Sequence, residues 1–186
     1  MMETDFRHTL RAQTRVEHDR LDQMITKLDI AQLADFKVFL KLHHSCFVVM
    51  WSRAADQGRS NSALSGMIDC LAADLEIVSE SCHPVKLPLP AAWDPLAIDY
   101  MVAGSRLGSV ILRKRWQTST DPCVQRANTY FSQPVDPTLW PETCRALSAV
   151  PMSSARADAI VKDTKTQFQL FAAAFAKIAN PESALA

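Results

Sequence analysis

A single histidine, His18, stands within an apolar stripe near the start of the sequence. It lies one helical turn after Thr14 and just before Leu21, and the repeat predicts a helix over residues 5–27 with the imidazole pointing inward. Most inward histidines only fill a hydrophobic core. A neutral imidazole in an apolar pocket also suits axial ligation of heme iron, because the protein then supplies one ligand and leaves the opposite face open.

Two glycines fall inside another predicted helix, over residues 97–116. Gly104 and Gly108 are two of only four glycines in the chain. Glycine within a helix costs about 1 kcal/mol relative to alanine, so the pair costs about 2 kcal/mol. Either a close helix crossing or a flat ligand lying against the backbone, with room for a diatomic molecule above its metal, would compensate. The flanking Ser105 and Ser109 are also small.

His43 and His44 are competing ligand candidates. They lie in a helix predicted over residues 31–55, where His43 shares the apolar face with Phe39 and Phe47. Histidines in this position are usually part of the core, although their spacing does not exclude a ligand role.

The whole chain is predicted to be all-α. Apolar residues recur mostly at intervals of three and four. Further helices are expected over residues 62–81, 124–131, 138–149 and 154–179. We expect Arg106 and Arg113 to face outward, the proline-rich residues 82–95 to form an extended connection, and residues 180–186 to be a frayed tail of a single domain over residues 1–186.

Composition excludes two classes of partner. Lys and Arg number 20 against 20 Asp and Glu, so the chain lacks the positive surplus typical of nucleic-acid binding. No apolar stretch reaches membrane-spanning length, and residues 1–20 carry acidic side chains in place of an apolar leader, which predicts a cytoplasmic protein. The five cysteines form no C-x-x-C pair and are assigned no role.

Two separated segments resemble one known family. LRAQTRVEHDRLD, residues 10–22, resembles the proximal helix of bacterial heme oxygenases, and YMVAGSRLGSVIL, residues 100–112, resembles their distal helix. The spacing between these motifs and the terminal pattern of Phe168, Phe171 and Phe175 resemble the bacteriophytochrome-associated members. Each motif is short, but their joint occurrence in this order is more specific.

The resemblance implies a single-domain heme oxygenase-like fold with heme between the first helix and the distal glycine helix. His18 would be the proximal iron ligand, while Gly104 and Gly108 would let the distal helix kink over the heme and steer bound oxygen toward a meso carbon. Heme would be both substrate and oxygen-activating cofactor, yielding biliverdin, carbon monoxide and ferrous iron. The expected partners are an electron donor, such as a ferredoxin or a flavin reductase, and a bacteriophytochrome.

The resemblance also assigns side chains around the heme. Arg11 matches a basic position that binds a propionate, and Tyr100 matches another propionate contact. An ordinary solvated arginine and a core tyrosine are the alternatives. Lys162 and Lys165 of the terminal helix are weaker propionate candidates. The remaining residues expected to contact heme are Thr14, Ser105 and Ser109.

Two departures from the family pattern leave other functions open. Many relatives carry an acidic residue and a further glycine where this chain has Ala103 and Ser109. The Ser109 side chain could narrow the distal pocket, shift its water or point away. One rival function is therefore heme or bilin binding without turnover. The other is a helical interaction module, in which Gly104 and Gly108 only pack helices and His18 lies in the core.

Overall fold

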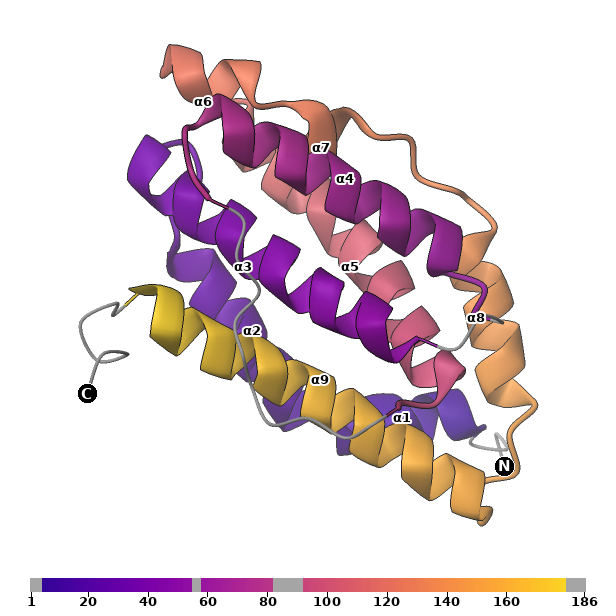
Figure 1. The fold of residues 1–186 in the computed structure, drawn as a ribbon. Coiled ribbons are helices and arrows are strands. Elements are labelled where there is room, and N and C mark those ends of the chain that lie inside the picture. Colours follow the sequence, from indigo (N-terminus) through magenta and orange to yellow (C-terminus); the bar gives the residue numbers. More distant parts are fainter. Residues whose placement is uncertain (1–4, 55–57, 82–91, 180–186) are drawn as a thin grey trace.

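The chain folds into α-helices, with no strand in residues 5–54, 58–81 and 92–179, which the computed structural model describes (Figure 1). The helices are α1 (Phe6–Gln13), α2 (Arg15–Lys27), α3 (Leu33–Arg53), α4 (Asn61–Ile77), α5 (Pro95–Trp116), α6 (Pro122–Arg126), α7 (Thr129–Ser132), α8 (Leu139–Ser148) and α9 (Ala155–Ala179). None of the helices in these ranges combines the length and apolar character needed to cross a membrane.

The prediction of an all-α chain is confirmed, but two predicted helices are each divided in the structure. The helix expected over residues 5–27 breaks at Thr14, whose hydroxyl donates to the carbonyl of Leu10 at 2.8 Å, a bond that bends helices. The helix expected over residues 124–131 breaks before α7. There the buried Asp74 carboxylate accepts the backbone N–H groups of Thr129 and Tyr130 at 2.8 and 2.9 Å.

Two predicted segments lie partly or wholly outside the described residues. Most of the connection expected over residues 82–95 and the whole tail over residues 180–186 belong to this part of the chain. The described end of that connection leads into α5 through Asp94, whose side chain caps the helix ahead of Pro95.

Helix α3 is the centre of the core. It packs against α4 on one side and α9 on the other, and α9 in turn covers α1 and α2 (Figure 1). Helix α5 packs against α8 and α9. The apolar stripes of these helices meet around the aromatic side chains of Phe36, Phe39, Phe47, Phe131 and Phe171.

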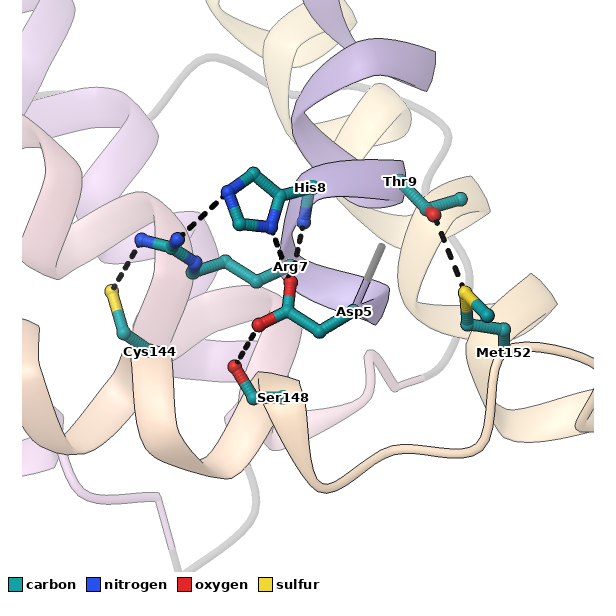
Figure 2. Close-up of polar contacts among 7 residues, drawn as sticks. All are labelled: Asp5, Arg7, His8, Thr9, Cys144, Ser148 and Met152. Atoms are coloured by element: carbon teal, nitrogen blue, oxygen red, sulfur yellow. Dashed lines mark hydrogen bonds and ion pairs between the residues drawn. The ribbon is translucent and has the colours of Figure 1, made fainter. Parts of the chain in front are cut away.

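The beginning of α1 is fixed to the end of α8 by a polar cluster (Figure 2). The Asp5 carboxylate caps α1 by accepting the His8 backbone N–H at 3.1 Å, and it also accepts the Ser148 hydroxyl. The hydroxyl of Thr9 lies 3.7 Å from the Met152 sulfur, in the connection that follows α8. These contacts set the position of α1, which carries Arg11.

Substitution of Asp5 by asparagine is expected to weaken this cluster in a pH-dependent way. The hydrogen bond from Ser148, followed by those from His8, lowers the pKa of Asp5 to about 2, against roughly 3.9 in an unfolded chain. A lowered pKa stabilises the fold above the unfolded value, and this stabilisation is lost as the pH falls through the folded value. Urea unfolding should therefore show Asp5→Asn to be less stable than wild type at pH 7, with the difference disappearing as the pH approaches 2.

Asparagine is a good N-cap, so this substitution removes the charge and preserves the cap. A stability difference that stays constant from pH 7 down to pH 2 would contradict the role given to the Asp5 charge.

Helix α5 is held at both ends. Near its beginning, the buried Asp99 carboxylate accepts the backbone N–H and the hydroxyl of Ser60 at 2.9 and 2.6 Å, which ties α5 to the start of α4. Near its end, the Arg115 guanidinium donates to the carbonyl of Thr26, in the last turn of α2, and to the carbonyl of Leu28, just beyond that helix. The helix between these anchors carries Gly104 and Gly108.

Candidate functional site

The α1–α2 segment and α5 are tied together at two levels. Tyr100 of α5 lies close to Arg11 and Thr14: burial raises the pKa of Tyr100, and the Arg11 charge and the Thr14 side chain oppose that rise. Arg115, fifteen residues after Tyr100 in α5, donates to the carbonyl of Leu28. Leu28 lies fourteen residues after Thr14. The two segments therefore run in the same direction, in nearly equal register.

This register places His18 level with Gly104. His18 lies four residues, about one helical turn, after Thr14, and Gly104 lies four residues after Tyr100. Between the two ties, α2 and α5 are not among the closely packed helix pairs of the described chain. The residues that lie between the ties are therefore candidates to contact a ligand held between these helices.

His18 is half exposed, so the prediction that its imidazole points into the core is wrong. Its side chain is 52% exposed, although other members of the same stripe are buried. These buried members are Phe6, Leu10, Thr14, Ile25 and Leu28. The stripe remains the inner face of the two helices, but at the level of His18 the protein covers the side chain only in part.

One nitrogen of His18 is held by carboxylates. Nδ1 lies 3.3 Å from an oxygen of Asp22 and 3.6 Å from an oxygen of Asp19, and the ring meets Phe168 edge-on with centroids 5.7 Å apart. Both carboxylate contacts use Nδ1, which leaves Nε2 for an external ligand. A carboxylate behind one ring nitrogen is the usual arrangement for a histidine that binds a metal through the other.

The two glycines are not explained by contacts with the protein. A Cβ atom added to Gly104 would meet only the Trp140 ring, at an ordinary distance of 3.9 Å, and one added to Gly108 would meet nothing within 4 Å. A close helix crossing is therefore not the reason for this pair, because no described backbone approaches either residue. The cost of two glycines inside α5 has no compensation within the described protein.

The glycines also lie on an apolar face that is open to solvent. Leu107 is 49% exposed and Ile111 is 68% exposed, and both fall at helical spacing from Gly104 and Gly108. Contiguous exposed apolar surface on a soluble protein commonly marks a binding site. The face is suited to a flat apolar ligand that lies directly against the helix backbone.

The serines beside the glycines direct their hydroxyls to their own helix. Ser105 donates to the carbonyl of Val102 at 2.8 Å, and Ser109 donates to the carbonyl of Arg106 at 2.7 Å. Ser109 is buried, so in this structure its side chain points away from the open face. A heme contact of either serine stays a prediction.

The basic propionate candidates lie in two places. Arg11 is exposed beside the half-buried Tyr100 and keeps the position expected for it. Lys162 and Lys165 line a surface hollow of about 450 Å³ with Gln13, and the Lys165 ammonium lies 3.7 Å from the Glu17 carboxylate. The roles of these residues stay predictions.

His43 and His44 are buried core residues. The His43 ring lies 2.9 Å from the Phe39 carbonyl through Nδ1, and burial lowers its pKa to about 4, so it is neutral at physiological pH. Burial also lowers the pKa of His44. Nowhere in the described ranges do three His, Cys, Asp or Glu side chains come together as a metal-binding group.

The fold is similar to a known enzyme structure. No protein-family model matches the sequence, and neither does any curated protein. Among solved structures, the NO- and CO-bound heme oxygenase from Neisseria meningitidis matches with a TM-score of 0.74, over 94% of this chain and 92% of that chain, at 16% identity. This chain has the heme oxygenase fold.

The predicted fold class is therefore confirmed. The resemblance to bacteriophytochrome-associated heme oxygenases in particular stays a prediction, as do the individual residue roles. In the heme oxygenase fold of this chain, the sequence motifs quoted above correspond to α1 with α2 and to α5.

Proposed function

We propose that the chain binds heme between α2 and α5 and cleaves it oxidatively to biliverdin, carbon monoxide and ferrous iron. One observation carries the proposal: a half-exposed histidine lies level with a glycine pair that no protein contact explains, in a heme oxygenase fold. His18 is the proposed iron ligand.

The residues present fit heme. The open face of Gly104, Leu107, Gly108 and Ile111 offers apolar surface for the macrocycle, with no side chain on the glycines to hold it away from the backbone. Heme propionates need cationic or hydroxyl partners at the edge of the site, and Arg11 and Tyr100 lie together, about two turns before His18 and one turn before Gly104.

The chain's own groups bind and orient the substrate. The Asp22 carboxylate lies 3.3 Å from Nδ1 of His18, where it would orient the ring and favour Nε2 as the ligating atom. Gly104 and Gly108, which carry no side chain, would leave space beside the helix backbone for a small molecule. Bound heme supplies the iron that activates oxygen against its own ring. Electrons come from a partner such as a ferredoxin or flavin reductase, and a bacteriophytochrome is the proposed recipient of biliverdin.

The orientation of the Ser109 side chain supports the proposal of turnover. Many relatives have a glycine at this position, so a serine side chain could stand beside the distal face. The Ser109 hydroxyl instead donates to the carbonyl of Arg106, and the residue is buried. We therefore propose catalysis in preference to heme binding alone.

An absorption titration with hemin, followed by a ferredoxin and its reductase under air, tests the function. A saturable Soret band that decays into a biliverdin spectrum is the expected result. A bound heme that persists under reduction would replace turnover by simple binding. If no saturable Soret band formed, the heme proposal would be wrong.

Replacing Asp22 by asparagine is expected to weaken hemin binding by roughly 10- to 100-fold, the usual effect of losing a carboxylate behind a metal-bound histidine. Asp19→Asn is the matched control, because its carboxylate is farther from Nδ1 and also lies 3.4 Å from Arg15. Hemin dissociation constants from the titration provide the measurement. An equal or larger effect of Asp19→Asn would contradict the assignment to Asp22.

A further inference from the structure

Arg106 is a buried cation, contrary to the prediction that it faces solvent. Its side chain is 5% exposed, and Nη2 donates to the carbonyls of Gln133 and Pro134 at 2.9 and 3.3 Å. The guanidinium carbon lies 5.7 Å from the centre of the Tyr130 ring. Arginine stays charged in proteins, yet no carboxylate of the described residues forms an ion pair with Arg106. Buried charges are usually paired with an opposite charge.

A pocket of about 290 Å³ adjoins this guanidinium. It lies between α5, the beginnings of α4 and α8, and the segment over residues 133–137, and Arg106 lines it together with Arg59, Gln133 and Trp140. At about 30 Å³ per molecule of liquid water, this volume holds about ten waters. His18, Gly104 and Gly108 are not among its lining residues, and of the open apolar face of α5 the pocket shares Leu107 alone.

The charged groups of the pocket are complementary to an anion. Arg106 and the exposed Arg59 provide two positive charges. The acidic lining residue is Asp136, whose exposed carboxylate already accepts the N–H and hydroxyl of Thr138 at 2.8 and 2.7 Å. The lining therefore has a net positive charge.

We propose that this pocket binds a small carboxylate anion. The carboxylate neutralises Arg106 and Arg59, and the Trp140 ring and neighbouring apolar side chains cover the carbon atoms. This ligand differs from heme in size and charge, so the pocket gives the chain a second binding activity.

Calorimetric titration of the hemin-free protein with succinate tests the proposal. Wild type is expected to bind one succinate saturably, because the dianion neutralises the two arginines. Arg59→Ala is expected to weaken succinate binding about tenfold, consistent with loss of one charge-assisted contact.

Arg113→Ala is the control, because this exposed arginine lies on the same helix and does not line the pocket. Absence of saturable succinate binding to wild type would overturn the proposal. Equal binding by Arg59→Ala and Arg113→Ala would do the same. The titration uses no hemin, so a negative result would not affect the heme proposal. A failure to bind hemin would likewise not affect the proposal of an anion site.

Discussion

Replacement of His18 by alanine is expected to abolish the Soret band of a stoichiometric heme complex and to leave the fold intact. The imidazole is half exposed and contributes little buried area, so the free energy of unfolding should stay within about 0.5 kcal/mol of wild type. Loss of the axial nitrogen, by contrast, removes the only proposed bond from the protein to iron. Hemin titrations followed at the Soret band, with urea unfolding of the same samples, measure both quantities.

His8→Ala is the matched control for this experiment. His8 is also an exposed histidine of the first helical segment, with its Nδ1 2.6 Å from the Asp5 carboxylate (Figure 2). It lies near the beginning of α1, ten residues before His18. It should bind hemin as wild type does. Added imidazole should restore a Soret band to His18→Ala, since it can occupy the vacated position. A His18→Ala protein with an unchanged Soret band would exclude His18 as the ligand.

Gly108→Ala is expected to stabilise the protein and impair its activity. A methyl group at this position meets nothing within 4 Å, so the ligand-free helix should gain about 1 kcal/mol from the better propensity of alanine. In the heme complex the same methyl group would stand between the backbone and the substrate. Hemin turnover should therefore fall, and Gly108→Leu, with its larger side chain, should block binding.

Gly104→Ala tests the same two effects one turn earlier in α5, because a Cβ there meets Trp140 at an ordinary contact distance and is also tolerated. Thermal unfolding and single-turnover heme degradation are the two measurements. A stabilised Gly108→Ala protein with wild-type turnover would mean that the open face of α5 does not receive the heme.

The sequence predicted most helices because their apolar residues recur at helical intervals over long stretches. It failed at Thr14 and before Thr129, where a side chain competes with the backbone hydrogen bonds of a helix. Thr14 bonds within its own turn, and Asp74 reaches the α7 backbone from 55 residues away. No local pattern reveals a partner that is so distant in sequence.

The candidate site was predictable in its residues but not in its exposure. A helical stripe identifies which side chains share a face, and His18 does lie on the inner face of its segment. Whether that face is covered depends on the distance between α2 and α5, which periodicity does not specify. The same limitation explains Arg106, whose position outside the apolar stripe predicted solvent exposure, whereas the segment over residues 133–137 covers it.

If heme binds as proposed, the uncovered apolar face of α5 would make the substrate a structural component of the protein. In the hemin-free chain, Leu107 and Ile111 remain in water, and the core is incomplete at this point. A ligand that binds only the folded state adds RT ln(1 + [L]/Kd) to the free energy of unfolding, about 2.7 kcal/mol at a hundredfold excess over Kd. The supply of heme would thus set how much of the protein is folded and long-lived, and consumption of the substrate would remove its own stabilising contribution.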